Sequence, residues 1–179
     1  MPDPSAMPYR PCVAVMLFNA QGDVWLGRRV PKWDGGQLAS PWQCPQGGID
    51  PGENPRDAAY RELLEEIGCD NVAVLAESRE WYRYDLPAEA LGIALDGKYR
   101  GQAQKWFAMQ FLGDESEINL IPPPPHKQEF DAWRWTPMDE VPQRVIAFKR
   151  PVYAAVIDEF RPIVAEQLGL PLPRAADRA

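Results

Sequence analysis

The stretch from Asn54 to Gly68 constrains the fold of this chain more than any other part of it. Asn54 is a favourable N-cap residue, and Pro55 suits the first turn of a helix. Residues 56–67 contain neither glycine nor proline, and Gly68 is well placed to end the helix. The sequence therefore predicts a helix with both of its ends defined.

Three glutamates share one side of this predicted helix. At ~100° per residue, Glu62, Glu65 and Glu66 fall within an arc of about 100°. The apolar stripe expected to face the core lies beside them and consists of Tyr60, Leu63, Leu64 and Ile67. Like charges at this spacing destabilise a helix, so the glutamates indicate either a solvated acidic face or a site for a divalent cation. The glycine pair at 47–48 lets backbone approach a ligand closely and favours the cation site.

The rest of the chain predicts several strands and a second helix. Residues 12–18 and 24–30 are expected to form a hairpin, and residues 45–48 are expected to turn. A capped helical turn is expected at 136–139. The expected strands are 12–18, 24–30, 42–44, 72–84 (as one strand or two), 104–112 and 130–135, and the second helix is about 151–168.

Length and composition indicate one globular domain. A chain of 179 residues that is 45% hydrophobic can bury a sizeable core. The prolines cluster at the termini and in expected loops such as 31–41 and 122–125, and no repeat or linker is seen. We expect a single α/β domain over residues 9–168, a flexible N-terminus at 1–8 and a disordered tail at 169–179.

Net charge excludes one class of function. The chain has 26 acidic and 19 basic residues, a formal net charge of -7, which argues against a protein that coats DNA or RNA non-specifically. Seven acids and only two arginines fall between Gly47 and Asp70, so much of the acidity belongs to the predicted helix and its flanks. A local contact with phosphate groups stays compatible with this charge.

Histidine and cysteine usage narrows the chemistry further. His126 is the single histidine, which argues against a Ser-His-Asp mechanism and a multi-histidine metal site. Cys12, Cys44 and Cys69 are far apart and form no CxxC pair, so we expect buried thiols in a reducing compartment. The N-terminus lacks the apolar core of a signal peptide, and the longest apolar run, 12–18, is too short to span a bilayer. We expect a cytoplasmic protein with no membrane partner.

The segment Gly47–Cys69 resembles the Nudix box. The matching positions are Gly47, Glu53, Arg61, Glu62, Leu63, Glu65, Glu66, Gly68 and Cys69, and only Cys69 departs from the usual aliphatic residue. The resemblance implies the Nudix fold, a mixed β-sheet sandwiched between α-helices, with the box as a loop–helix–loop. It also implies Mg²⁺ or Mn²⁺ as cofactor, two or three ions with substrate, held by Glu62, Glu65 and Glu66 together with Gly47. Glu53 and Arg61 are implied to form a structural pair.

The resemblance extends to a bacterial subfamily that removes pyrophosphate from the 5′-triphosphate end of RNA and so starts RNA decay. It is carried by segments 9–11, 42–48, 101–107, 129–135 and 148–150. The alternative activity is hydrolysis of diadenosine tetraphosphate or other dinucleoside polyphosphates. A more remote alternative is an inactive nucleotide-sensing domain, against which the intact box glutamates argue. An activating protein partner is compatible with the sequence but is not indicated by it.

The subfamily resemblance also nominates residues outside the box. Glu129 is the expected catalytic base and a further metal ligand, and its alternative is an ordinary loop acid. Substrate contacts are expected from Arg10, Arg29, Tyr84, Lys105, Phe148 and Lys149, with Arg29 and Phe148 on opposite faces of a base. The alternative for these residues is a solvent-facing or core position. Four tryptophans on predicted strands are expected to pack in the core, namely Trp42, Trp106, Trp133 and Trp135.

Overall fold

A computed structural model describes residues 4–30 and 42–171 of the chain. The strands are β1 (Tyr9–Phe18), β2 (Val24–Arg29), β3 (Trp42–Gln43), β4 (Gln46–Gly48), β5 (Val72–Glu77), β6 (Tyr82–Asp85), β7 (Gly101–Phe111) and β8 (Phe130–Thr136). The α-helices are α1 (Pro55–Ile67), α2 (Val141–Arg144) and α3 (Arg150–Leu168), and the short 3₁₀ helix η6 (Ala147–Lys149) precedes α3. Further 3₁₀ turns are η1 (Pro4–Ala6), η2 (Ala88–Ala90), η3 (Leu95–Gly97), η4 (Glu115–Glu117) and η5 (Met138–Glu140).

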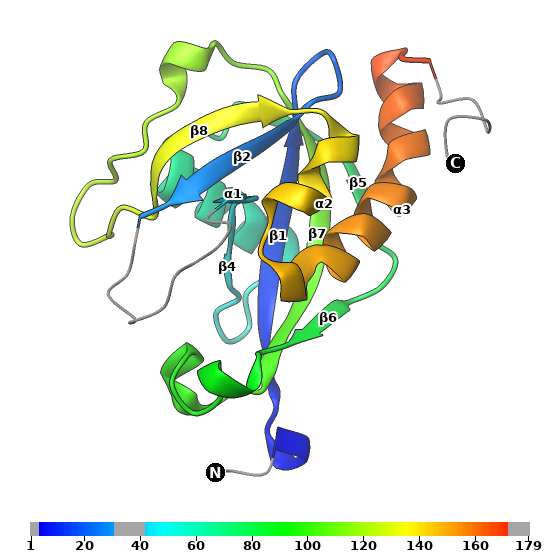
Figure 1. The fold of residues 1–179 in the computed structure, drawn as a ribbon. Coiled ribbons are helices and arrows are strands. Elements are labelled where there is room, and N and C mark those ends of the chain that lie inside the picture. The colour runs from blue at the N-terminus through cyan, green and yellow to red at the C-terminus, as the bar shows by residue number, and fades with distance from the viewer. Residues whose placement is uncertain (1–3, 31–41, 172–179) are drawn as a thin grey trace.

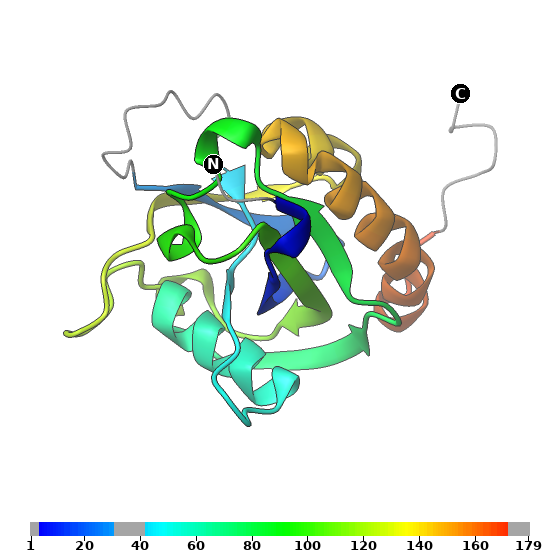
Figure 2. The same cartoon turned by 90° about the horizontal axis from the view of Figure 1, so that it is seen from below.

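The strands form a mixed sheet between two helical layers (Figure 1). Its main path runs β3-β2-β1-β7-β5, while β4 pairs with β1, β6 with β7 and β8 with β2. Central strands β1 and β7 run parallel along ten residue pairs, and the other pairings are antiparallel. Helix α1 covers one face and α2 with α3 covers the other (Figures 1 and 2). The implied fold class, a mixed sheet sandwiched between helices, is confirmed.

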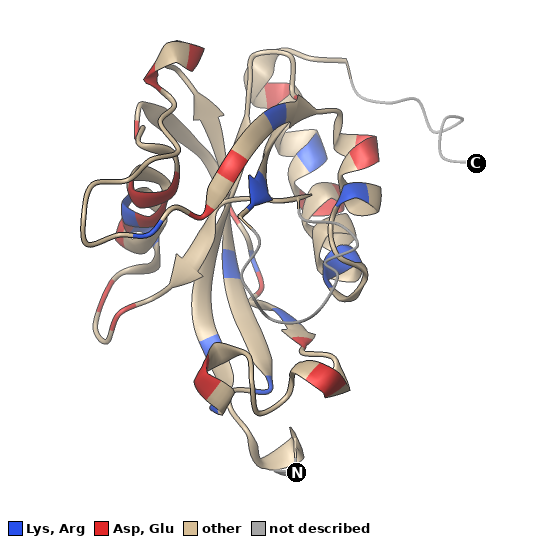
Figure 3. Cartoon of the chain, turned by 60° about the vertical axis from the view of Figure 1, so that its left-hand side comes forward, with Lys and Arg blue, Asp and Glu red and all other residues tan. Residues whose placement is uncertain are grey.

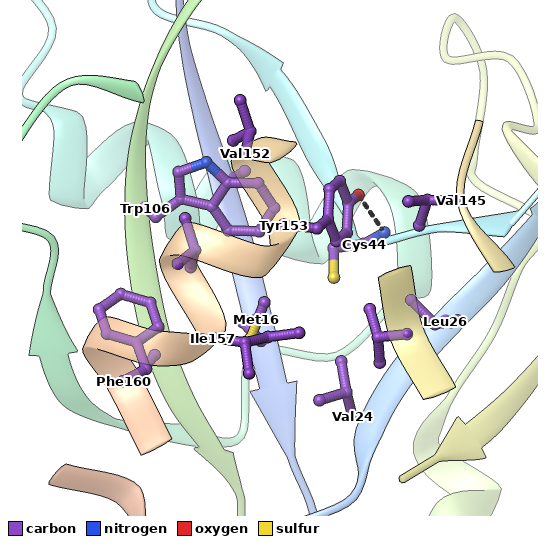
Figure 4. Packing of buried hydrophobic residues seen from close by; sticks show 14 of the residues in the cluster. Met16, Val24, Leu26, Cys44, Trp106, Val145, Val152, Tyr153, Ile157 and Phe160 are labelled. Carbon is purple, nitrogen blue, oxygen red and sulfur yellow. Dashed lines mark hydrogen bonds between the residues drawn. The ribbon is translucent and has the colours of Figure 1, made fainter. Parts of the chain in front are cut away.

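Strand β1 is buried on both faces, as its unbroken apolar run predicts for a central strand. Alternate side chains point to opposite faces of a sheet. Val13, Val15 and Leu17 accordingly join the core under α1. Ala14, Met16 and Phe18 join the core under α3, part of which Figure 4 shows.

Tyr153 ties α3 to the sheet within that second core. Its hydroxyl accepts a hydrogen bond of 3.0 Å from the backbone N–H of Cys44 (dashed line in Figure 4). Its ring packs edge-on against Trp106 with centroids 5.0 Å apart. All three cysteines are buried free thiols, as expected. Trp106 is fully buried, while Trp42, Trp133 and Trp135 are partly buried against the two cores.

Helix α1 begins and ends where the sequence predicts. The side chain of Asn54 accepts a hydrogen bond from the backbone of Arg56, and Gly68 adopts the left-handed conformation at φ 70°. The predicted core-facing stripe is wrong at one position, because Leu64 is 49% exposed. Ala58 and Ala59 are fully buried instead. The face of α1 that packs against the sheet therefore includes these two small residues and the buried Glu66.

The predicted turn at 45–48 is also wrong. Residues Gln46–Gly48 form β4, which pairs antiparallel with Cys12–Ala14 of β1. The chain turns at Pro51 and Gly52 instead, where Gly52 has a φ of 79°. The predicted hairpin is partly right: β1 and β2 are joined by a turn but pair at Phe18 and Val24, because β2 extends away along β8.

The remaining elements agree with their predictions within a few residues. The expected strand at 72–84 is divided into β5 and β6, because the hydroxyl of Ser78 bonds the carbonyl of Glu80 and interrupts the ladder. The expected loop at 31–41 lies outside the described residues, as does the tail from residue 172 on. Within the described ranges, no helix is long and apolar enough to cross a membrane.

Candidate active site

A cavity of about 790 Å³ opens between β4, the glutamate side of α1, the segment before β8 and η6. Ten of the residues nominated from the sequence line it, namely Arg10, Arg29, Gly47, Glu62, Glu65, Glu66, Tyr84, Glu129, Phe148 and Lys149. They come from seven separate parts of the chain, and the fold brings them together. The acidic face of α1 is seen in red in Figure 3.

Arg61 braces the loop before α1 against the helix itself. Its Nε and Nη2 donate to the two carboxylate oxygens of Glu53 at 2.8 Å each, and Nη2 also donates to the carbonyl of Gly48 at 2.9 Å. This bidentate pairing, with a backbone N–H donated by Asp50, lowers the pKa of Glu53 to about 2. The structure thus forms the pair that the box implied.

Gly47 leaves room for the carboxylate of Glu62. A Cβ atom at position 47 would overlap the carboxyl group of Glu62, so a side chain cannot be placed there without moving it. Glu62 accepts a hydrogen bond of 2.8 Å from Nη1 of Arg61. Burial raises the pKa of Glu62 above its ordinary value, and the Arg61 charge opposes this rise.

Glu66 is the most deeply buried acid of the site, with 7% of its surface exposed. One of its oxygens accepts a hydrogen bond of 3.1 Å from the backbone N–H of Gln46 in β4. Burial raises the pKa of Glu66 well above its ordinary value, and the negative charges of Glu62 and Glu129 raise it further. A buried carboxylate that faces two other acids requires a positive charge beside it to stay ionised.

Glu65 and Glu129 complete the acidic side of the cavity. Glu129 stands at the entry to β8, where its carbonyl accepts a hydrogen bond of 2.9 Å from the N–H of Val30 at the end of β2. His126, which our sequence reasoning did not place in the site, lies 3.5 Å from Glu65, measured from Nδ1 to Oε2. Its position three residues before Glu129 is the signal that could have identified it.

The acids of the cavity fit a hard divalent cation in their chemistry. Each of Glu62, Glu65, Glu66 and Glu129 offers oxygen donors, the ligands that Mg²⁺ and Mn²⁺ prefer. Their mutual repulsion at Glu66 is the kind that a bound cation relieves. Within residues 4–30 and 42–171, however, no three acidic, histidine or cysteine side chains lie close enough together to hold an ion in their present positions.

Lys149 supplies a buried positive charge to the same cavity. Only 6% of its surface is exposed, and its Nζ lies 3.3 Å from Oε1 of Gln43 and 3.5 Å from Oε1 of Gln46. The ammonium group also stands over the ring of Tyr84, 5.3 Å from its centroid. Burial, and next the charge of Arg29, lowers the pKa of Lys149 to about 8.

A glutamine network beneath Lys149 was not foreseen from the sequence. The Tyr84 hydroxyl donates to Oε1 of Gln102 at 2.6 Å, and Nε2 of Gln104 donates to Oε1 of Gln46 at 2.9 Å. Gln102 and Gln104 are 4% and 1% exposed, although both are polar residues in a strand. Two glutamines at alternate positions, and so on one face of β7, are the signal that could have indicated a polar cavity floor.

The two arginines and Phe148 border the same cavity. The guanidinium of Arg10 lies against Gly48, where an added side chain would meet its Nη2. Nε of Arg29 is buried and has no hydrogen-bond partner among the described residues. Phe148 packs on Tyr84 with ring centroids 5.5 Å apart, and it is half-buried.

Lys105 is the nominated residue that the fold does not bring to the cavity. It lies on β7 opposite Val13, on the α1 side of the sheet, and its Nζ pairs with Glu77 at 3.4 Å. Adjacent strand positions face opposite sides of a sheet, so Gln104 faces the cavity side while Lys105 does not.

Comparison with known proteins agrees with this arrangement. The family model described as the NUDIX domain matches residues 8–156. The chain is 56% identical over 158 residues to an RNA pyrophosphohydrolase of Agrobacterium fabrum, covering 87% of this chain and 93% of that protein. It is 52% identical over 170 residues to an RNA pyrophosphohydrolase of Brucella abortus, covering 92% and 94%. The crystal structure of a MutT protein from Methanosarcina mazei superposes with a TM-score of 0.59 at 16% identity, over 86% of this chain and 96% of that one, which is a likeness of fold.

Proposed function

The chain belongs to the NUDIX domain family, and we propose that it removes pyrophosphate from the 5′-triphosphate end of RNA and leaves a 5′-monophosphate. It is a hydrolase of phosphoric anhydride bonds. One observation supports the assignment to a site: a single cavity is lined by the four nominated glutamates together with the partly buried Arg10 and Arg29 and the buried Lys149. Such a cavity suits a ligand that carries several phosphates and is bound with divalent ions.

The metal ligands that we propose are Glu62, Glu65, Glu66 and Glu129, with the carbonyl oxygen of Gly47. Nudix hydrolases generally use divalent metals, and we propose Mg²⁺ or Mn²⁺, two or three ions when substrate is bound. When bound, such ions neutralise phosphate charge and activate water. The brace of Arg61 on Glu53 fixes the loop that carries Gly47 relative to the helix that carries the glutamates.

Glu129 is the proposed base that takes a proton from the attacking water at one of its carboxylate oxygens. It stands in the cavity beside Glu66, whose pKa its charge raises. It also stands at the end of a proline-containing segment rather than within a strand, so its side chain has more freedom to move than those on α1.

The cavity also offers matching partners for the phosphates and a base of the substrate. We propose that Lys149, Arg10 and Arg29 bind the phosphates, since arginine and lysine are the usual phosphate partners. Phe148 stacks on a base, and Arg29 covers its other face. Tyr84 supports Phe148 and holds the side chain of Gln102 by its hydroxyl.

We place this activity in the cytoplasm, in one domain over residues 9–168, where removal of pyrophosphate would start RNA decay. The test compares the wild-type protein on 5′-triphosphorylated RNA and on diadenosine tetraphosphate, each with Mg²⁺ and with Mn²⁺. Release of pyrophosphate with a higher kcat/KM for RNA supports the proposal. A much higher kcat/KM for the dinucleotide refutes the RNA assignment and favours the alternative substrate. If the protein hydrolyses neither substrate, the remaining alternative is an inactive nucleotide-sensing domain.

The role of Glu129 has its own test. Glu129→Gln should reduce kcat on RNA by about 100-fold, the scale of a lost general base, with little change in melting temperature. Glu140→Gln is the matched control, because Glu140 pairs with Arg144 on the surface outside the cavity. Near-normal turnover by Glu129→Gln removes Glu129 from the catalytic set.

A further inference from the structure

The segment before β8 carries a cavity residue that the proposed chemistry does not use. Lys127 lines the cavity two residues before Glu129. It is the fourth lysine or arginine of the described lining, beside Arg10, Arg29 and Lys149, which already have proposed roles. Lys127 forms no hydrogen bond or ion pair with another described residue. Its charge is therefore uncompensated within the described part of the chain.

Lys127 stands where this segment meets α1. The neighbouring His126 lies 3.5 Å from Glu65 of α1, measured from Nδ1 to Oε2, and its N–H donates to the carbonyl of Pro123 at 3.2 Å. Figures 1 and 2 both show the yellow-green segment beside α1 and away from α3. Because Glu65 is a proposed metal ligand, Lys127 belongs to the metal end of the cavity.

The proposed base-binding end of the cavity lies toward the other face of the sheet. Phe148 packs on Tyr84, and both pack in the core between the sheet and α3, whereas α1 covers the opposite face. At a 5′-triphosphate end the γ phosphate is the group furthest from the base. A substrate with its base on Phe148 and its phosphates at the glutamates of α1 therefore directs its γ phosphate toward the segment that carries Lys127.

The bond that breaks gives this phosphate a particular role. Release of pyrophosphate from a 5′-triphosphate breaks the link between the α and β phosphates, so the β and γ phosphates leave together. A cation that contacts the leaving group stabilises the negative charge that develops on it as the bond breaks. Lysine suits this position as a compact charge on a flexible stem, and the exposed side chain of Lys127 is able to follow the leaving group.

We propose that Lys127 binds the γ phosphate of the RNA end and so raises the activity on a 5′-triphosphate relative to a 5′-diphosphate. The inference rests on the proposed function and deepens it, because it assigns the residue that distinguishes the number of phosphates at the RNA end. A 5′-diphosphate has no γ phosphate, so its leaving group is a single phosphate that ends short of Lys127.

The test compares Lys127→Met and Lys127→Arg with the wild type on two RNAs of one sequence, with a 5′-triphosphate and with a 5′-diphosphate. Lys127→Met should lower kcat/KM for the triphosphate about fivefold, the scale of one exposed charge-assisted contact, and kcat/KM for the diphosphate less than about twofold. Lys127→Arg keeps the charge and should retain most of the wild-type ratio of the two kcat/KM values. Lys98→Met is the matched control and should leave this ratio unchanged, because Lys98 is exposed and lies outside the cavity lining.

Inhibition by the two products, measured with the diphosphate RNA as substrate, sharpens the test. The inhibition constant of pyrophosphate should rise about fivefold in Lys127→Met, whereas that of 5′-monophosphorylated RNA should not change. Equal losses on both RNAs, an unchanged ratio in Lys127→Met or the same shift in Lys98→Met overturns the inference. Wild-type protein that hydrolyses neither RNA refutes the proposed function and the inference with it, whereas an active wild type with an unchanged ratio in Lys127→Met refutes the inference alone.

Discussion

Replacement of Lys149 by methionine should stabilise the fold while it weakens the function. Methionine has about the length of the lysine stem and fills irregular apolar space. The substitution removes a buried ammonium group whose contacts with Gln43 and Gln46 are long, at 3.3 and 3.5 Å. A buried charge with such weak partners costs stability, and the phosphate-binding role that we propose for Lys149 gives a reason for the protein to retain it.

The size of the effect follows from the burial of the ammonium group. Burial lowers the pKa of Lys149 from 10.5 to about 8, which at ~1.4 kcal/mol per tenfold change corresponds to about 3 kcal/mol against the charged form. The variant also loses the contacts with Gln43 and Gln46, which offsets about 1 kcal/mol of this gain in stability. We therefore expect Lys149→Met to raise the free energy of unfolding at pH 7 by about 2 kcal/mol.

The pH dependence gives the sign of the effect a separate check. Below pH 8 the lysine is charged in both the folded and the unfolded wild-type chain, so the variant has its full advantage in free energy of unfolding. Between pH 8 and pH 10.5 the folded protein loses this proton first, so the gain declines, and above pH 10.5 it is absent. Urea denaturation in the presence of EDTA, at pH 7, 9 and 10.5, measures the difference between the variant and the wild type.

Lys105→Met is the matched control, because Lys105 is only 13% exposed but is paired with Glu77 on the other side of the sheet. It should not stabilise the protein and should leave KM for RNA unchanged. Lys149→Met should raise KM for triphosphorylated RNA by about tenfold or more, the scale of one lost charge-assisted contact. A Lys149→Met protein that is less stable than the wild type at pH 7, or equally stabilised at pH 7 and 10.5, refutes the reasoning.

Two further predictions concern the loop before α1. Glu53→Gln should lower the free energy of unfolding by about 2 kcal/mol at pH 7, after partial solvent screening; the difference from the wild type should shrink as pH falls from 4.5 toward 2, through the lowered pKa of Glu53. Urea denaturation measures this loss, with Glu140→Gln as the control. The ion pair of Glu140 with Arg144 lies on the surface and should contribute no more than ~0.5 kcal/mol. An equal loss in both variants contradicts the prediction. Gly47→Ala should displace the carboxylate of Glu62 and lower kcat on RNA by about 100-fold. Steady-state kinetics measure kcat, and a melting curve checks that the variant is folded. A kcat equal to that of the wild type would show that Glu62 does not need the space that Gly47 leaves open.

Helix α1 was predictable from sequence because its signals are local. Asn54 and Gly68 cap α1 through bonds within a few residues of themselves, so the boundaries could be placed without knowledge of the partners. The face that α1 buries was less predictable. The helical wheel was interpreted from the large apolar residues, so it predicted that Leu64 is buried. In the structure Leu64 is exposed, and Ala58 and Ala59 are buried. What turns the helix is the close approach that alanine permits, which is a property of the packed pair and not of the helix alone.

Strand partners and buried polar groups depend on long-range pairing, which no local pattern specifies. Gln46 and Gly48 have turn-like neighbours in sequence, yet β1 offers them a free edge and they pair with it. The alternate spacing of Gln102 and Gln104 hints at one polar face of β7, but the partner that buries them, Gln46 of β4, is known only once the strands pair. Lys105 was nominated with the cavity residues because of its position in a shared motif, but strand alternation directs it to the opposite face.

The charge of the cavity links metal binding to substrate binding. Its described lining contains five glutamates against four lysines and arginines, so it is not a basic pocket that would bind a triphosphate by itself. A triphosphate adds several negative charges beside Glu62, Glu66 and Glu129, which already repel one another. Divalent ions that lie between the glutamates and the phosphates are attracted by both. Each ligand should therefore raise the affinity for the other by the same factor.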